Sequence, residues 1–455
     1  MTASDPPRLS RAGLARAGSV VPAPPVRIVH LGAGAFHRTH QAWFTARATD
    51  AAEWGIAAFT GRSDTVARQL APQDGLFTLV ERGPARDRFE IVGSIAEVHA
   101  AARSDRLYAL LAAPATAIVT ITVTEAGYHL RPDGQLDPDD PAVTHDVHAI
   151  RTGAVGRLRT PAGRLLAGLV RRDRAGAPPL TVIPCDNLPA NGTRLRDAMA
   201  TLAAQTGLAQ ALGGTAFATT SVDRITPHTT AADRRAVADA TGWWDEGAVV
   251  AEPFADWTLS GRFAGDRPDW ESAGARFVDD LEPYERRKLL LLNGGHLALA
   301  FRGLACGHAT VAQAMSDQRC RGELERFWDE AARAVAAGAD TDAYRASLVE
   351  RFENERIEHR LAQIAVDTVT KLRLRILPVL AHERAAGRPG TAALAVVHAW
   401  ADCLRAGLVA HPDGDDADIA VAALLAVETG TENIGANHET KSRVEPRVGS
   451  VADAH

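Results

Sequence analysis

Apolar residues follow two different patterns in the two parts of the chain. In the first part, short apolar runs rich in β-branched residues alternate with segments of helical periodicity, which is typical of buried strands in a mainly parallel sheet. The predicted strands are Val26–Leu31, Trp54–Thr60, Ala117–Thr124, Leu180–Pro184 and Thr215–Thr220. This alternation predicts an α/β domain.

Strand signals nearly disappear after about Leu281. Long segments rich in Ala, Leu, Arg and Glu follow, and their periodicity predicts helices at Arg321–Gly338, Ala343–Ala365 and Gly390–Leu408. We therefore expect a domain boundary near Asp280 and an all-helical domain beyond it.

The first predicted strand leads directly into a loop that reads Gly-Ala-Gly-Ala-Phe-His. Gly32 and Gly34 permit a tight turn and let the backbone approach a pyrophosphate, and a helix starting near Phe36 would direct its amides at the phosphates. His37 replaces the third glycine of the usual fingerprint, and we interpret His37 and His40 as packing or surface residues. The position of the loop favours a Rossmann-type dinucleotide-binding domain. The alternative is a strand–helix turn that binds no ligand.

The choice between NAD and NADP depends on the residues after the second predicted strand. Asp64 could bind a ribose hydroxyl, whereas Arg62 and Ser63 could accept a 2′-phosphate. Glu125 either faces the cofactor or caps the segment that follows it. We expect NAD or NADP as cofactor, with NAD preferred.

These patterns divide the 455 residues into four segments. Residues 1–25 lack a continuous apolar core and are expected to form a flexible leader. Residues 26–280 form the Rossmann-type domain, and residues 281–428 form a helical substrate and catalytic domain. Residues 429–455 are polar and aperiodic, so we expect a loosely attached tail.

The charge and the cysteine content limit the kinds of partner that we expect for this protein. The net charge is −6 and the arginines are scattered, which argues against nucleic acid or an anionic membrane as partner and favours small molecules. No stretch approaches the roughly 20 apolar residues that span a bilayer. The four cysteines form no CxxC pair, so we expect reduced thiols, a cytoplasmic protein and no metal.

The segment around Lys288 carries the densest group of polar side chains. On an α-helix with Lys288 at zero, Glu285 falls at about 60°, His296 at about 80° and Asn293 at about 140°. One face would then carry a base, a carboxylate, an amide donor and an imidazole. Gly294 and its glycine neighbour suggest that a nicotinamide or substrate passes close to the backbone, or that two helices break there with Asn293 as a cap.

Alcohol oxidation needs a base for the hydroxyl proton, donors for the alkoxide and a hydride acceptor. Lys288 is a candidate base because burial near the apolar run 289–292 would lower its pKa. Asn293 can donate to the alkoxide, His296 can bind a hydroxyl or carbonyl oxygen, and Glu285 can relay the proton. Tyr284 with Lys288 also matches the YxxxK spacing of short-chain dehydrogenases, but about 250 residues separate it from a glycine loop of different spacing.

Several segments resemble the polyol-specific long-chain dehydrogenases and reductases, the family of mannitol 2-dehydrogenase and fructuronate reductase. The matching segments are RIVHLGAGAFHRTHQAWF (27–44), TVTEAGY (122–128), PCDNLPANG (184–192), SVDRITPHT (221–229), VVAEPFADW (249–257) and FVDDLEPYERRKLLLLNGGH (277–296). The resemblance implies metal-independent hydride transfer between NAD(P) and a secondary alcohol or ketone of a linear polyol or sugar acid.

The resemblance also implies roles for single residues. Lys288 would be the general base, Asn187 and Asn293 would form the oxyanion hole, and His296 would bind substrate. Asp223 would support the site, or it would form a structural ion pair with the neighbouring arginine. Asn187 could instead be only a turn residue.

Two further roles follow from the resemblance. Glu285 would gate a proton path to solvent, and Gly32, Gly34 and Phe36 would line the dinucleotide. We also expect a monomer.

One segment departs from the family pattern. Where the mannitol enzymes tend to have DGSxR, this chain reads Asp-Thr-Val-Thr-Lys, so Lys371 replaces the expected substrate-binding arginine, and Arg373 and Arg375 follow. Lysine keeps the charge but loses the bidentate fork. The substrate therefore stays open between a polyol and a uronate, and a sugar phosphate or a non-catalytic dinucleotide sensor is the alternative.

Overall fold

The chain divides into two compact units. The computed structural model describes residues 6–61, 63–131, 133–336 and 338–410. Of these described residues, those up to Lys288 and those of Val335–Glu358 form unit 1. Those of Leu289–Ala334 and those from His359 onward form unit 2. A helical segment that follows the start of unit 2 in the sequence thus belongs to unit 1. The predicted tail, residues 429–455, lies outside the described residues.

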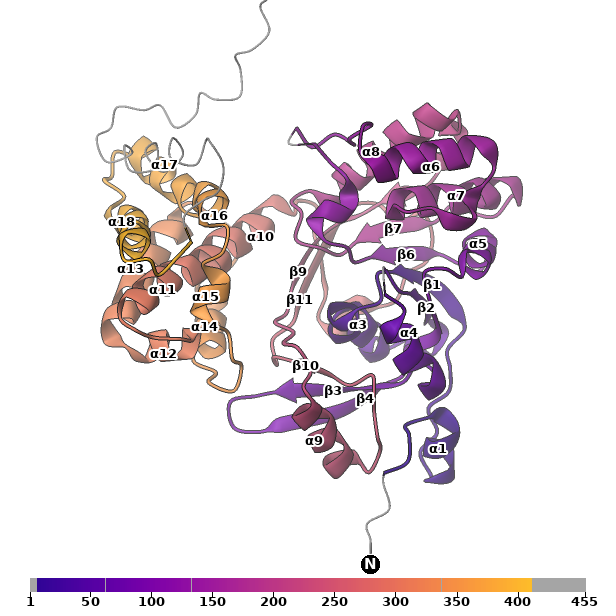
Figure 1. Cartoon of the computed structure of the whole chain (residues 1–455), viewed down its shortest axis with the longest axis horizontal. Helices are drawn as coiled ribbons and strands as arrows, with labels where there is room; N and C mark the ends of the chain where they lie inside the picture. The colour runs from indigo at the N-terminus through magenta and orange to yellow at the C-terminus, as the bar shows by residue number, and fades with distance from the viewer. Residues whose placement is uncertain (1–5, 62, 132, 337, 411–455) are drawn as a thin grey trace, which may run out of the picture. The chain divides into compact units, whose positions relative to one another are not determined.

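A six-stranded parallel sheet forms the centre of unit 1 (Figure 1). Its strands, in spatial order, are β5 (Ile95–His99), β2 (Gly55–Phe59), β1 (Val26–Leu31), β6 (Ile118–Ile121), β7 (Thr181–Pro184) and β8 (Ala216–Phe217). This is the 3-2-1-4-5-6 order of a doubly wound dinucleotide-binding sheet. The predicted α/β domain of Rossmann type is confirmed.

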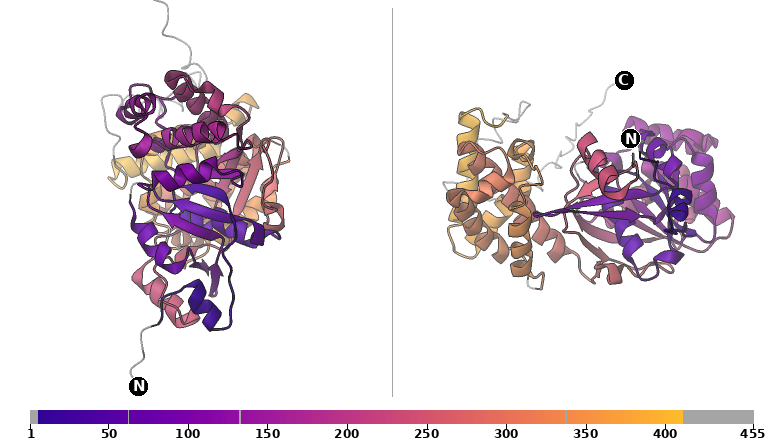
Figure 2. Two further views of the ribbon diagram at one scale, coloured as in Figure 1. Left: turned by 90° about the vertical axis from the view of Figure 1, so that its right-hand side faces the viewer. Right: turned by 90° about the horizontal axis from the view of Figure 1, so that it is seen from below.

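Side chains from alternate positions of these strands pack on opposite faces of the sheet. Ile28 and Ile56 belong to one apolar core, whereas Val29 and Ala57 belong to the other. Both faces are buried, as expected for a parallel sheet covered by helices on both sides. The left-hand view of Figure 2 shows helices layered over the sheet.

Two three-stranded sheets complete the β-structure of unit 1. One has the order β10 (Val249–Ala251), β3 (Phe77–Arg82), β4 (Asp87–Val92), and the other β12 (Arg276–Phe277), β11 (Asp256–Ser260), β9 (Thr219–Asp223). The predicted single strand Thr215–Thr220 is wrong, because its residues are shared between β8 and β9 in different sheets. The β3–β4 hairpin escaped prediction because polar residues interrupt the apolar ones in both strands, so neither has the apolar run of a central strand.

The helices of unit 1 precede, connect and follow the strands. They are α1 (Arg11–Arg16), α2 (Ala35–Thr39), α3 (Gln41–Arg47), α4 (Thr65–Leu70), α5 (Ser104–Ala112), α6 (Pro141–Thr152), α7 (Pro161–Arg174), α8 (Asn191–Thr206), α9 (Ala231–Thr241), α10 (Glu282–Arg287) and α14 (Thr341–Phe352). The helix predicted for Ala343–Ala365 therefore ends at Phe352, and its last residues, from His359 onward, lie in unit 2.

Residues 6–25 differ from the flexible leader that the sequence predicts. Helix α1 is capped by Ser10, whose side chain accepts a hydrogen bond from the amide of Gly13, and Leu9 and Leu14 are buried. The Arg11 guanidinium donates to the carbonyls of residues 21, 22, 93 and 95. Arg11 therefore fixes this segment onto unit 1.

Unit 2 is helical in its described part, apart from one isolated bridge between Thr310 and Arg360. Its helices are α11 (Gly294–Ala305), α12 (Val311–Ser316), α13 (Gln318–Arg333), α15 (Leu361–Ile364), α16 (Thr368–Arg375), α17 (Leu377–Ala385) and α18 (Thr391–Arg405). Helix α11 is buried on nearly all sides and packs against α12, α13, α15 and α18. It is the central helix of this unit.

The predicted helices Arg321–Gly338 and Gly390–Leu408 correspond to α13 and α18. The helical character of the second domain is confirmed. Among the described residues, no helix has the length and apolar character needed to cross a membrane.

Candidate active site

A cavity of about 640 Å³ opens at the carboxyl ends of β1, β6 and β7 in unit 1. Strand order reverses between β1 and β6, and ligands of doubly wound sheets bind at this switch point. The lining residues come from the segments after the three strands and from β9: Gly32, Gly34, Ala35, Phe36, His37, Thr122, Val123, Thr124, Glu125, Ala126, Cys185, Asp186, Asn187 and Val222. The volume lies in the range of small-molecule and cofactor sites.

The two glycines of the first loop differ in what requires them. Gly32 has φ +105°, and a Cβ there would lie 1.9 Å from the carbonyl oxygen of Thr122, so no other residue fits. A Cβ on Gly34 would meet only the Gly32 carbonyl oxygen, at 3.5 Å, which is ordinary contact. Gly34 lines the cavity, so its missing side chain leaves room for a ligand at the backbone. This arrangement fits a dinucleotide.

Three histidines lie in or next to this loop and are fully buried, and His37 also lines the cavity. The His37 ring stacks on His30 at 3.4 Å between centroids, and His40 stacks on Phe36 at 5.0 Å. Burial lowers the pKa of His30 and of His40 to about 3, and the pKa of His37 also lies well below its usual range. All three are neutral at physiological pH. The interpretation of His37 and His40 as packing residues holds, although neither is on the surface.

The other residues predicted to bind the cofactor do not share one position relative to the cavity. Glu125 begins a short 3₁₀ turn and lines the cavity. Asp64 precedes α4 and pairs with Arg68 one turn later, and it is not among the cavity-lining residues. Arg62 lies outside the described residues.

The Lys288 side chain reaches the edge of the cavity. Its Nζ donates hydrogen bonds to Oδ1 of Asn187 and to the carbonyl of Val222, both at 2.6 Å. Asn187 and Val222 line the cavity. The loop after β7 and the last residues of β9 thus position the ammonium group through two oxygen acceptors.

Lys288 begins a π-helix, Lys288–Asn293, rather than a turn of α-helix. Hydrogen bonds in a π-helix reach the fifth residue instead of the fourth, so the spacing of 100° per residue does not hold across it. The predicted angular positions of Asn293 and His296 relative to Lys288 are therefore wrong. Glu285 lies in α10, before this change of geometry.

Glu285 is positioned by the loop that carries Asn187. Its Oε1 accepts a hydrogen bond of 3.1 Å from the amide of Ala190. Burial raises the pKa of the Glu285 carboxyl, and the charge of Lys288 opposes this shift. A raised pKa makes this carboxyl a better proton acceptor than an ordinary glutamate.

Asp223 is fully enclosed by groups that the sequence did not indicate. Arg351 of α14 donates to both of its carboxylate oxygens, at 2.8 and 2.9 Å, and the Tyr344 hydroxyl donates at 3.0 Å. Arg351 also binds both oxygens of the buried Glu252, at 2.8 Å each. Burial opposes the ionisation of Asp223, but Arg351 outweighs it, and the pKa of Asp223 falls below its usual value.

The alternative ion pair of Asp223 with Arg224 is not formed. Arg224 instead donates to the backbone carbonyl of Glu252 and lies 3.7 Å from Glu81. Asp223 is the last residue of β9, and the two neighbouring side chains have different partners.

Asp186 is a cavity residue that sequence reasoning missed. One of its oxygens accepts a hydrogen bond from the Tyr128 hydroxyl, and the other accepts from the amide of Leu188 at 3.0 Å. Burial raises its pKa to about 6. The CDN motif contained this residue, but only its neighbour Asn187 had an expected role.

Asn293, His296 and Lys371 lie in unit 2. The His296 ring is buried and meets the His359 ring edge-on, with centroids 4.7 Å apart. Lys371 donates to the carbonyl of Ile364 at 3.0 Å, and burial lowers its pKa.

The glycine pair next to Asn293 serves helix packing. A Cβ on Gly294 would lie 3.0 Å from the Phe327 ring, and one on Gly295 would lie 2.6 Å from Nε1 of Trp328. Both expectations for this pair are therefore wrong: α13 is the close neighbour, and helical structure continues through the glycines. The Asn293 side chain makes no capping hydrogen bond.

The doubly wound sheet, the glycine loop and the cavity at the switch point define a dinucleotide-dependent oxidoreductase. Residues 26–272 match the family described as Mannitol dehydrogenase Rossmann domain, and residues 280–405 match the Mannitol dehydrogenase C-terminal domain. The chain belongs to the mannitol dehydrogenase family, whose members act on CH–OH groups.

Relatives and solved structures agree with this assignment. The chain is 35% identical to D-mannonate oxidoreductase of Escherichia coli over 378 residues, which cover 78% of this chain and 75% of the relative. It is 33% identical to mannitol 2-dehydrogenase of Aspergillus clavatus over 377 residues, covering 78% and 73%. The structure of Pseudomonas fluorescens mannitol 2-dehydrogenase with NAD and D-mannitol matches with a TM-score of 0.75 and 32% identity, covering 94% of this chain and 89% of that one.

Proposed function

We propose that this enzyme interconverts a secondary alcohol and a ketone on a linear polyol or sugar acid, with NAD or NADP and with Lys288 as general acid/base. The observation that carries the proposal is the position of the Lys288 ammonium group. It lies 2.6 Å from two oxygens of residues that line the cavity at the switch point. A proton donor or acceptor is thereby fixed beside the place where this fold binds its dinucleotide.

Gly32, Gly34 and Phe36 would hold the dinucleotide along the first loop, where the backbone is open to the cavity. The nicotinamide supplies the site that accepts or returns a hydride. The remaining requirement is a proton transfer, which falls to side chains of this chain.

In the oxidative direction, Lys288 in its neutral form takes the hydroxyl proton of the substrate. In the reductive direction, its ammonium group returns a proton to the new hydroxyl. Asn187 accepts from Lys288 through Oδ1, so its amide N–H groups serve as donors to the alkoxide oxygen. Asn293 and His296 are proposed as the second oxyanion donor and the substrate ligand, on the basis of the family resemblance.

Glu285 is proposed to pass the proton between Lys288 and solvent, since its pKa is raised by burial. Asp223 is proposed to support the site through its negative charge, which interacts with Lys288. We propose no metal ion in this proton transfer, because an amine and amide donors supply the acid, the base and the stabilising hydrogen bonds.

The proposed substrate is either a polyol or a sugar acid. The relatives are named for mannonate and for mannitol. Lys371 is the proposed cationic contact, and a cation favours the carboxylate of a hexuronate over a hydroxyl.

Absorbance at 340 nm tests the proposal, with NADH and NADPH each offered against fructose, fructuronate, tagaturonate and fructose 6-phosphate. We expect consumption of one reduced cofactor with a ketose or a keto-acid. Consumption only with the phosphate ester would favour a sugar-phosphate dehydrogenase. A folded protein that binds either cofactor but oxidises it with none of these compounds contradicts the proposed function.

A further inference from the structure

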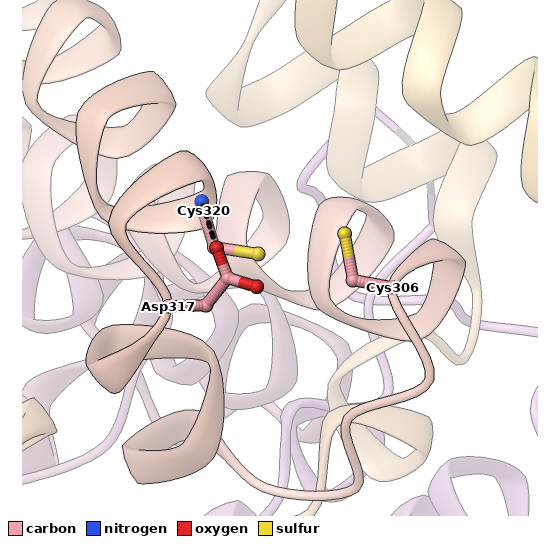
Figure 3. A group of neighbouring side chains, drawn as sticks. All are labelled: Cys306, Asp317 and Cys320. Atoms are coloured by element: carbon pink, nitrogen blue, oxygen red, sulfur yellow. Dashed lines mark hydrogen bonds between the residues drawn. The ribbon is translucent and has the colours of Figure 1, made fainter.

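A cluster of metal-binding side chains lies in unit 2, outside the proposed active site. Cys306 directly follows α11, Asp317 lies between α12 and α13, and Cys320 is in the first turn of α13. The two sulfur atoms and one carboxylate oxygen all lie within 4.8 Å of one another. Figure 3 shows the two thiols facing each other with the carboxylate beside them.

The Asp317 carboxylate is held in place by three hydrogen bonds. Its Oδ1 accepts from the amides of Arg319 and Cys320, at 2.8 and 3.2 Å, and thereby caps α13. Its Oδ2 bonds to Nε2 of His308 at 3.0 Å. A carboxylate offers about four lone-pair positions, so one of them stays available for a cation.

These three groups match the ligand preferences of zinc. Two cysteine sulfurs and a carboxylate oxygen are ordinary Zn²⁺ ligands, with bonds of about 2.3 Å and 2.0–2.2 Å. Tetrahedral angles with such bonds place the ligand atoms about 3.6–3.8 Å apart. The observed limit of 4.8 Å requires the side chains to close by about 1 Å at most.

We propose that Cys306, Asp317 and Cys320 bind one Zn²⁺ ion, with a water molecule as fourth ligand and with His308 orienting the carboxylate. The bound ion ties the end of α11 to the start of α13. Because α11 is the central helix of unit 2, the ion stabilises the whole helical unit. Its role is structural and independent of the proton transfer proposed for Lys288.

The arrangement of the cluster favours a cation over a disulfide between the same cysteines. The ligand oxygen of Asp317 lies within 4.8 Å of both sulfur atoms. A divalent ion would bind all three groups at once, and a coordinated thiol loses its proton. A disulfide would join the two sulfur atoms and leave the oriented Asp317 carboxylate outside the bond.

Metal content and Co²⁺ spectra of the full-length, tag-free protein test the proposal. Reduced protein that is dialysed against Zn²⁺ and then against metal-free buffer should retain about one zinc per chain. Co²⁺ in place of zinc should give the visible bands of a tetrahedral site and the near-ultraviolet bands of sulfur ligation. Zinc should also raise the thermal unfolding temperature.

Three variants locate the site. C306S and C320S should each lose the sulfur band and most of the retained zinc. Asp317→Asn keeps a capping side chain, so it should fold like the original protein and yet bind zinc at least tenfold more weakly. Cys403→Ser is the matched control, since Cys403 is another buried cysteine of unit 2 outside the cluster, and it should retain zinc fully.

Two results overturn the proposal. One is a protein that retains well under 0.1 zinc per chain, on the order of a surface contaminant, and shows no tetrahedral Co²⁺ spectrum. The other is a Cys306–Cys320 disulfide in the freshly purified chain, with no metal bound after its reduction. Neither readout uses catalytic activity, so each is separate from a failure of the proposed function.

Discussion

Lys288 and Asn187 lie 101 residues apart in sequence, and their side chains meet at 2.6 Å. The amide oxygen of Asn187 and the carbonyl of Val222 orient two N–H groups of the ammonium. These two contacts fix the position of the Nζ group, which suits the proposed general acid/base role. Removing this side chain should affect the chemical step far more than cofactor binding, because the residues proposed to bind the cofactor lie on another loop.

Lys288→Ala should keep its affinity for NAD or NADP and lose about 10²- to 10⁴-fold in turnover, the usual contribution of general acid/base catalysis. Cofactor titration by fluorescence and steady-state kinetics would measure both. Lys371→Met is the comparison variant, and it should raise KM with a smaller effect on kcat, as expected for a substrate contact. Near-normal turnover of Lys288→Ala would exclude the assigned role.

Asp186 should make stability depend on pH. Its pKa is about 6 in the folded chain and 3.8 in its ordinary state, so the folded state binds more protons between these values. The Asp186 contribution to stability is therefore lost as pH rises from about 4 to 6, by up to about 3 kcal/mol.

Asp186→Asn removes this ionisation and keeps the size of the side chain. Urea unfolding should be measured at intervals between pH 4.5 and 7.5. The free energy of unfolding of the variant should increase relative to that of the original protein as pH rises. A stability difference that stays constant over this range would show that Asp186 does not titrate there.

Four residues in and around the cavity show what local sequence can and cannot indicate. Lys288 and Asn187 lie in sequence motifs whose residue types indicate the chemistry proposed for them. Arg351 was not predicted, because its partner Asp223 lies 128 residues away and nothing in its surroundings marks it. Asp186 was missed for another reason, since its raised pKa comes from burial, which depends on the folded loop.

At the scale of elements, the π-helix Lys288–Asn293 accounts for the main error in the predicted site. Hydrophobic periodicity distinguishes a helix from a strand, but it does not reveal one widened turn. In unit 2, the Leu291 carbonyl within this turn accepts a hydrogen bond from the Trp328 indole at 2.8 Å. That contact comes from α13, and it requires the glycines of α11 for close approach.

Gly295→Ala should therefore destabilise the protein, although alanine favours helices. A Cβ at this position would lie 2.6 Å from Nε1 of Trp328, and such overpacking costs about 1–3 kcal/mol. Gly322→Ala in α13 is the matched control, because its Cβ would meet only the Arg326 guanidinium at 3.5 Å. The control should be neutral or more stable by up to about 1 kcal/mol.

Denaturant unfolding of both glycine variants would measure the difference. If Gly295→Ala were as stable as Gly322→Ala, the packing of α11 on α13 would not be what requires the glycine.

For the whole molecule, the β–α alternation and the glycine loop were sufficient to predict the Rossmann-type domain. The helical periodicity after about Leu281 was sufficient to predict the helical second domain. The return of Val335–Glu358 to unit 1 was not predictable. Helix α14 looks like its neighbours in composition, and the buried contacts of its Tyr344 and Arg351 with Asp223 place it in unit 1. Arg351 also binds Glu252. Those contacts join two carboxylates to one guanidinium, so the arginine is essential for their burial.

Arg351→Met should destabilise the protein by about 3–5 kcal/mol, because Asp223 and Glu252 would remain buried without their cation. Adding Glu252→Gln should recover part of this loss, since only one uncompensated charge then remains. Equilibrium urea unfolding of the single and double variants gives the coupling free energy between Arg351 and Glu252. A loss of less than about 1 kcal/mol for Arg351→Met would contradict the structural role of the cluster.

The discontinuity of unit 1 also has a consequence during synthesis. Arg351 emerges from the ribosome 99 residues after Glu252, a delay of about 5–20 s at usual elongation rates. Throughout that interval the nascent unit contains its carboxylates and its complete central sheet but lacks the arginine that lets them be buried. A fragment cut at the boundary near residue 280 would have this deficit permanently, so the cofactor-binding half is not expected to be separable as a stable piece.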